Sequence, residues 1–305
     1  MKIQLISDGS IPVPPVNGWG ALERVVWNYK IYLEKEGHDV IVSNHLESAK
    51  VLEDWRRFKP DVVHNHIGKH WEALLLIYGC KKIVTNHGGE FLTHLPFYEN
   101  LAKNFFKDCK LLMLTDAEKK FYESFGLNVS VLPNGVDTTI FKPTLENRTG
   151  SIYLGQINPR KRQAFYQENN LDCYFAGNKA DDTFNYNKHN YLGSWDHNQV
   201  CDNLVKFSNL ILLSQSELQP LVCLEGLAAG LGLVISRPAA QSLDISKPWI
   251  DVIPDEHLNN IDYINTIIEK NREISSKYRS EIIQYSKQFD WSNIIKSYLE
   301  VIQNV

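Results

Sequence analysis

The feature that most constrains this chain is a repeated alternation between short apolar runs and segments with helical periodicity. Each run is almost continuously apolar, which is typical of a parallel strand buried on both faces. The segments between the runs are long enough for crossover helices, so the pattern predicts parallel α/β sheets covered on both faces. The runs lie at residues 2–7, 39–43, 61–66, 83–86, 111–115 and 129–133, and again at 151–155, 172–177, 190–193, 209–214 and 233–236.

The alternation lapses around residues 134–150, a polar stretch rich in turn-forming residues. The length of 305 residues also suits two domains. We therefore expect one Rossmann-like domain over 1–140 and a second over 150–288, facing each other across a cleft. The segment 290–305 has helical periodicity, with Trp291, Ile295, Leu299 and Ile302 on one face.

Composition excludes several functional classes. The hydrophobic fraction is 43% and the net charge is −4, which gives no general attraction to nucleic acid. The five cysteines are scattered without a CxxC pair, which argues against a disulfide scaffold or a zinc ribbon. No apolar run approaches the ~20 residues needed to span a bilayer, and the N-terminal apolar stretch is too short for a signal peptide. We therefore expect a cytoplasmic protein.

Residues 214–230, SQSELQPLVCLEGLAAG, hold the densest group of candidate site residues. Pro220 suits the first turn of a helix, whose N-terminus would offer free N–H groups and partial positive charge to a phosphate. Glu225, one to two turns inside, would accept hydrogen bonds from the two ribose hydroxyls of a nucleotide. Glu217 would face whatever the phosphates carry. The structural alternative is a helix with an ordinary acidic residue near its start.

A cluster of cations follows the glycine that ends the run 151–155. Arg160, Lys161 and Arg162 would face the same cleft and neutralise a diphosphate leaving group. Because the helix macrodipole disfavours basic residues at a helix N-terminus, their position suggests an anionic partner. The structural alternative is a solvated basic helix start.

Glycines and histidines mark further loops in the first half. Gly18 and Gly20 precede a helix and permit close backbone approach to a ligand, although the full GxGxxG spacing is lacking. His87 can donate a hydrogen bond to a phosphate or sugar oxygen, or it can be structural. His64 and His66 resemble a metal pair, but no third ligand accompanies them at convincing spacing, so we expect them in the core or the cleft wall.

Several segments occur in an order shared with a known family. They are ALERVVWNYKIYLEKEGHDVIV, VTNHGG, LPNGVDTTIFKP, YLGQINPRK and ELQPLVCLEGLAAG, followed by the terminal FDWSNIIKSYLE. This order resembles that of the GT-B, GT4-like retaining glycosyltransferases over nearly the whole chain. The resemblance implies two Rossmann-like domains, with the terminal helix crossing back onto the first. It also implies transfer of a sugar from a nucleotide diphosphate donor to an acceptor hydroxyl with retention of anomeric configuration.

The resemblance also implies roles for individual residues. Glu225 would hold the nucleotide ribose, Glu217 would contact the donor sugar, and Lys161 would grip the diphosphate. Gly20 would match the loop that approaches the phosphates, and His87 the histidine near the donor sugar. The expected catalytic residues are thus Glu217, Lys161 and His87, and the expected donor-binding residues are Gly18, Gly20, Gln156, Arg160, Lys161, Gln219, Leu221, Val222 and Glu225.

Three positions depart from the family pattern. Gln156 stands where the family usually has an arginine, so one diphosphate cation is missing. Gln219 and Pro220 replace the usual aromatic–glycine pair, and a proline cannot donate a backbone N–H. The Gln219 side chain and the N–H groups of Leu221 and Val222 would then hold the sugar hydroxyls.

These departures leave a second hypothesis, a nucleotide-sugar-binding protein that has lost catalysis. A third, a dinucleotide-dependent oxidoreductase, lacks GxGxxG after the first apolar run. No DxD motif is evident, so we expect no essential metal and no cofactor beyond the donor.

The acceptor would be a glycan, a lipid-linked molecule or a small molecule. The segment 99–110 carries Lys103, Lys107 and Lys110 beside apolar residues, so it can contact an anionic membrane. A core-packing helix with one solvated face is the favoured alternative.

Overall fold

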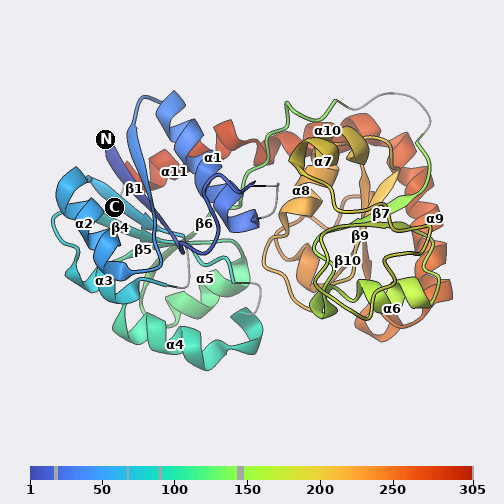
Figure 1. Ribbon diagram of the computed structural model, residues 1–305, viewed down its shortest axis with the longest axis horizontal. Helices are drawn as coiled ribbons and strands as arrows, with labels where there is room; N and C mark the ends of the chain where they lie inside the picture. The colour runs from blue at the N-terminus through green and yellow to red at the C-terminus, as the bar shows by residue number, and fades with distance from the viewer. Residues whose placement is uncertain (17–19, 67–68, 89–90, 143–147, 304–305) are drawn as a thin grey trace. The chain divides into compact units, whose positions relative to one another are not determined.

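The computed structural model describes residues 1–16, 20–66, 69–88, 91–142 and 148–303 (Figure 1). The chain divides into two compact units. One comprises Met1–Gly135 together with Trp291–Val305, and the other comprises Val136–Asp290. Each unit contains one parallel sheet with helices between its strands, which confirms the predicted α/β architecture.

The first unit is built on a six-stranded parallel sheet in the order β2-β1-β3-β4-β5-β6. Its strands are β1 (Lys2–Ser7), β2 (Asp39–Asn44), β3 (Val62–Asn65), β4 (Lys81–Val84), β5 (Lys110–Met113) and β6 (Asn128–Val131). Its helices are α1 (Ala21–Lys35), α2 (Ser48–Phe58), α3 (Trp71–Leu76), α4 (Leu95–Asn104), α5 (Asp116–Glu123) and α11 (Trp291–Gln303). The central strands are buried along their length, as a sheet covered on both faces requires.

The terminal helix α11 packs against α1 in the first unit, as predicted. The Trp291 ring lies 5.3 Å from that of Tyr29, and the Tyr298 ring lies 5.2 Å from it. Trp291 also lies directly on the backbone of Gly135, where a Cβ atom would come within 2.3 Å of the indole. The glycine of the LPNGV segment thus makes room for the tryptophan of the terminal helix.

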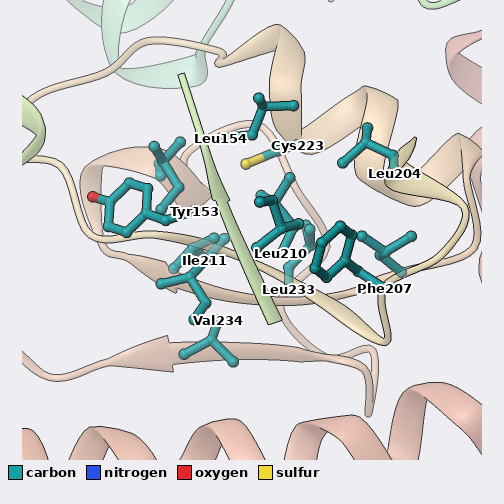
Figure 2. Close-up of a cluster of buried hydrophobic side chains, with 14 of the residues drawn as sticks. Tyr153, Leu154, Leu204, Phe207, Leu210, Ile211, Cys223, Leu233 and Val234 are labelled. Atoms are coloured by element: carbon teal, nitrogen blue, oxygen red, sulfur yellow. The ribbon is translucent and has the colours of Figure 1, made fainter. Parts of the chain in front are cut away.

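The second unit has a five-stranded parallel sheet in the order β11-β10-β9-β7-β8. The strands are β7 (Ser151–Leu154), β8 (Tyr174–Ala176), β9 (Asn209–Leu212), β10 (Gly232–Ser236) and β11 (Ile250–Ile253). The helices are α6 (Gln163–Glu168), α7 (His197–Leu204), α8 (Leu221–Ala228), α9 (Ile261–Lys277) and α10 (Arg279–Ser286). Figure 2 shows part of the core, where side chains of β7, β9 and β10 meet Cys223 of α8.

In the second unit, one strand prediction was wrong and one strand was missed. Residues 190–193 form no strand, because only an isolated bridge joins Tyr191 to Phe175. The edge strand β11 was not predicted, since its sequence IDVI is short and interrupted by an aspartate.

The segment 99–110 buries its apolar side chains. Leu101 and Phe106 are only 2% exposed, so this part of α4 and the turn after it pack into the core. Contact with a membrane surface therefore stays a prediction. No helix among the described residues has both the length and the apolarity needed to cross a bilayer.

Candidate functional site

Two loops meet at the carboxyl-terminal edge of the second sheet. β7 and β9 are neighbouring parallel strands, so the segments that follow them leave the sheet at the same edge. The backbone N–H of Gln215, after β9, donates to the carbonyl of Arg160, after β7, at 2.9 Å. This hydrogen bond links the two segments that carry most of the predicted site residues.

A shielded ion-pair cluster forms where these loops meet. Lys161 Nζ lies 2.7 Å from Glu217 Oε1, and Arg160 Nη1 lies 3.2 Å from the same oxygen. The Lys161 and Glu217 side chains are only 11% and 10% exposed, so water screens their attraction weakly. Arg160 also donates to the carbonyl of Ser216. Two cations from one predicted segment therefore contact a glutamate from another.

The backbone of Lys161 is held by two residues that the sequence analysis missed. The Asn158 side chain accepts a hydrogen bond from the Lys161 N–H at 3.0 Å. The Tyr153 hydroxyl donates to the Lys161 carbonyl at 2.5 Å and accepts from the Leu213 N–H at 2.8 Å, so it bridges the two loops. The dipeptide Asn158–Pro159 is itself a helix-start signal, and a tyrosine inside a buried strand requires a hydrogen-bond partner.

The surroundings of Glu217 keep its carboxylate ionised. Burial by itself would raise its pKa, but the positive charges of Lys161 and Arg160 outweigh burial and hold the pKa below its usual value. The site therefore presents a fixed negative charge beside two cations.

The helix α8 begins at Leu221 on the same edge. Pro220 is its N-cap and not part of its first turn, one residue from the predicted position. The N–H groups of the first residues, including Leu221 and Val222, have no acceptor within a helix. Glu225 lies one turn into α8 and is partly buried, and Gln219 precedes the helix with 7% exposure.

One of the three predicted cations points elsewhere. Arg162 has a left-handed backbone, with a φ of 60°, and its guanidinium lies 5.1 Å from the ring centres of Phe165 and Tyr166. It also donates to the Asn259 side chain. The expectation that Arg162 joins the other two cations was therefore wrong, because aromatic faces of α6 attract its guanidinium.

Gln156 is exposed, and its contacts are local. Its backbone carbonyl accepts a hydrogen bond from the Gln163 side chain at 3.0 Å, and its side-chain oxygen accepts from Asn158 at 3.3 Å. Its predicted role in donor binding stays a prediction.

The remaining predicted residues belong to the first unit. His87 follows β4 and is partly buried, and burial lowers its pKa to about 4, so the ring is neutral near pH 7. His64 on β3 and His66, directly after it, are fully buried, as the core interpretation predicted. Gly20 is the N-cap of α1 with a φ of 131°, a conformation that favours glycine. Gly18 lies outside the described residues.

Comparison with known proteins places this fold. Residues 43–140 match the model of a family described as Glycosyltransferase Family 4. Sucrose-phosphate synthase from Thermosynechococcus elongatus is similar over 100% of this chain and 98% of its own, with 12% identity and a TM-score of 0.78. HepE from Anabaena, in complex with UDP-glucose, is similar over 100% of both chains, with 15% identity and a TM-score of 0.71. AviGT4, a glycosyltransferase involved in avilamycin A biosynthesis, is similar over 99% of this chain and 97% of its own, with 14% identity and a TM-score of 0.67.

This is the GT-B glycosyltransferase fold. The predicted resemblance to GT4-like glycosyltransferases is thereby confirmed by sequence in residues 43–140, and the predicted GT-B fold is confirmed over the whole chain. No curated protein matches the sequence.

Within this GT-B chain, the ion-pair cluster and α8 belong to the second α/β unit. In the described part of the chain, no group of three or more histidine, cysteine, aspartate or glutamate side chains is arranged to hold a metal ion. The expectation of a metal-independent reaction stays a prediction.

Proposed function

We propose that this protein is a retaining glycosyltransferase that moves a sugar from a nucleotide diphosphate donor to an acceptor hydroxyl. The observation that carries the proposal is the shielded contact between Lys161 and Glu217, at 2.7 Å, beside the start of α8. The family match and the fold support the same class of reaction.

Lys161 and α8 can together bind the diphosphate. A lysine ammonium has three N–H donors, so Lys161 can keep its bond to Glu217 and still donate to a phosphate oxygen. The first N–H groups of α8 and the positive end of its dipole add attraction for the same anion. The charge on the departing diphosphate would then be stabilised by Lys161, Arg160 and α8 without a metal.

Glu217 would act on the sugar. Breaking the bond between the anomeric carbon and the phosphate oxygen passes through an oxocarbenium-like transition state. Because the cations keep Glu217 ionised, its carboxylate can stabilise the positive charge that develops on the sugar. The role is positioning and electrostatic stabilisation, and we propose no covalent intermediate.

Substitutions at these two residues test the proposal by separating binding from chemistry. Glu217→Gln should leave nucleoside diphosphate affinity within about twofold and lower turnover by about tenfold or more, or ~1.4 kcal/mol in the barrier. Lys161→Ala should weaken the nucleoside diphosphate by ~1.5–3 kcal/mol, as expected for a charged hydrogen bond, and lower turnover further. Arg162→Ala is the matched control, because that cation stacks on α6 and should change neither quantity. Full turnover in Glu217→Gln would refute the catalytic role.

A ligand panel separates this proposal from its alternatives. UDP, GDP, ADP and NAD are titrated by calorimetry, starting with UDP because HepE, one of the similar structures, is described in complexes with UDP and UDP-glucose. Transfer from a nucleotide sugar to any acceptor supports the proposal. Nucleotide binding without transfer to glycan, lipid-linked or small-molecule acceptors supports a non-catalytic binding protein, and binding of NAD alone supports an oxidoreductase.

A further inference from the structure

Three histidine rings form a row in the first unit. The ring centres of His64 on β3 and of His66, the residue after β3, are 3.7 Å apart, and the His87 ring centre lies 5.6 Å from that of His66. His66 Nδ1 is 3.4 Å from His87 Nε2, at the long end for a hydrogen bond between these nitrogens. His87 is the member of the row that is predicted to contact substrate, so His66 is in a position to act through it.

The other nitrogen of His66 decides where the shared proton lies. His66 Nε2 is buried and has no hydrogen-bond partner among the described residues. A buried N–H without an acceptor is rarer and more costly than a buried acceptor without a donor. The favoured tautomer of His66 therefore carries its proton on Nδ1 and donates it to His87 Nε2. His87 then accepts at Nε2, and its own proton must be on Nδ1.

The groups around the row keep it neutral. The Tyr29 ring packs 4.8 Å from that of His66, and the Tyr298 ring stacks 5.3 Å from that of His64. Burial lowers the pKa of His64 and of His66 well below the ordinary value and raises the pKa of both tyrosines. Each histidine in the row therefore has one donor and one acceptor nitrogen near pH 7.

The position of His66 is itself fixed by packing. His64 Nε2 lies 2.9 Å from the Thr85 hydroxyl, and this contact holds the ring that packs against His66 at an interplanar angle of 34°. The Tyr298 ring, from the terminal helix α11, stacks on the His64 ring, and the Tyr29 ring of α1 contacts both His64 and His66.

We propose that His66 is a positioning residue that holds His87 in the tautomer with its proton on Nδ1. His87 thereby presents an N–H donor, and not a lone pair, to an oxygen of the sugar or phosphate. The assignment of that oxygen rests on the proposed glycosyltransferase function. The assignment of the His87 tautomer does not rest on that function.

Nitrogen-15 NMR of histidine-labelled protein tests the tautomer directly, with the His87→Gln variant identifying the His87 signals. We expect the Nδ1–H form in the wild type. His66→Phe keeps a ring of similar size but removes the donor, so the Nε2–H form of His87 should become populated. His66→Asn retains a side-chain N–H near the position of Nδ1 and should restore the wild-type tautomer. Ser48→Ala is the matched control, because it removes a hydroxyl from another shielded histidine, His70, and touches none of the three rings of the row.

Kinetics give the functional half of the test once a donor is known. His66→Phe should lower kcat about tenfold with KM changed less than about threefold, since positioned proton donors contribute mainly in the transition state. His66→Asn should recover most of that loss, and Ser48→Ala should retain wild-type turnover. Unfolding measurements on each variant identify any loss that comes from stability alone.

Two outcomes would overturn the proposal. One is an Nε2–H tautomer of His87 in the wild type, and the other is an unchanged His87 tautomer in folded His66→Phe. If the wild type transfers no sugar from any donor, the proposed function fails, and the NMR result still decides whether His66 sets the tautomer of His87.

Discussion

Glu217 and Glu118 are both shielded carboxyl groups, yet their surroundings shift their pKa values in opposite directions. Two cations contact Glu217 and lower its pKa despite burial. Glu118 in α5 is 0% exposed, and burial raises its pKa to about 7. Its hydrogen bonds come from neutral groups, so they offset the cost of burying the charge only in part.

Glu118 also supports the loop that carries His87. The Asn86 side-chain amide donates to Glu118 at 3.0 Å, and the Asn86 side-chain oxygen accepts from the Gly88 N–H at 3.0 Å. The residues on both sides of His87 are therefore tied to α5 through one carboxyl group.

The first prediction is a pH-dependent contribution of Glu118 to stability. Its folded pKa is about 7 against an ordinary 4.5, so the folded state favours the protonated form. The contribution is fully present below about pH 4.5 and is lost as the pH rises through about 7. The unfolding free energy of the wild type, taken relative to that of Glu118→Gln, should thus fall by up to ~3 kcal/mol from pH 5 to pH 8. Urea unfolding across this range measures it.

Glu217→Gln is the control for the pH dependence. Because the folded pKa of Glu217 is lowered, its contribution is present above the unfolded pKa and is lost only as the pH falls through the folded pKa. The difference in unfolding free energy between wild type and Glu217→Gln should be constant between pH 6 and pH 8. A constant difference for Glu118→Gln as well would show that Glu118 is ionised throughout.

The second prediction concerns Glu225. If this carboxylate accepts both ribose hydroxyls, Glu225→Ala should weaken nucleoside diphosphate binding by ~1.5–3 kcal/mol. Glu269→Ala, which removes an exposed glutamate on α9 of the same unit, should leave the affinity unchanged. Calorimetry on both variants checks this, and equal affinities in folded protein would exclude the ribose assignment.

At the scale of elements, the docking of α11 depends on a single glycine. Gly135 directly follows Asn134 in the loop after β6, and the Trp291 ring occupies the space that any side chain at Gly135 would need. Trp291 is 1% exposed and contacts Tyr29 of α1, so it cannot move aside without leaving the core. The terminal helix and the loop after β6 are therefore fitted to each other.

The third prediction is that Gly135→Ala destabilises the fold by ~1–3 kcal/mol, as overpacking of a core does. Gly226→Ala is the matched control, because a Cβ at this buried glycine of α8 would meet Leu210 at 3.4 Å, an ordinary contact. Trp291→Leu should cost less in the Gly135→Ala background than in the wild type, since the two sites interact. If chemical denaturation shows that the two substitutions lower the unfolding free energy additively, the steric contact between the two residues is not the cause of the destabilisation.

At the scale of the whole molecule, the proposed donor contacts are distributed unequally. The ion-pair cluster and α8 lie within Val136–Asp290, whereas Gly20 and His87 lie in the first unit. Nucleotide binding should therefore stabilise the second unit directly, through its own residues.

The fourth prediction combines nucleotide stabilisation with metal removal. A nucleoside diphosphate at about 100 times its Kd should raise the unfolding free energy by ~2.7 kcal/mol. Hydrogen exchange should slow in residues 155–163 and 213–228, the two loops and α8. Because the proposal assigns the diphosphate charge to Lys161, Arg160 and α8, saturating EDTA should leave the stabilisation and the turnover nearly unchanged. Activity lost in EDTA and restored by magnesium or manganese would contradict the metal-independent mechanism.

The sequence by itself determined most of the segments that form the two sheets, with β11 missed, and where α8 and α11 lie. Strands such as Lys2–Ser7 and Asn209–Leu212 are buried on both faces, so their sequences are almost continuously apolar. The helix carrying Glu225 is marked by its proline and its apolar length. The run at 190–193 failed because one bridge is too little pairing for a strand, and local apolarity does not reveal how many partners a segment finds.

Only the tertiary structure decided which of these residues meet. Lys161 and Glu217 are 56 positions apart, and Glu118 lies 32 positions from Asn86. Arg160 and Arg162 are near neighbours in sequence, yet one joins Glu217 and the other stacks on α6. Periodicity reports which face of an element is buried, whereas these contacts depend on loop backbone directions and on the order of strands within a sheet. Those are properties of the packed chain, and no local pattern of residues contains them.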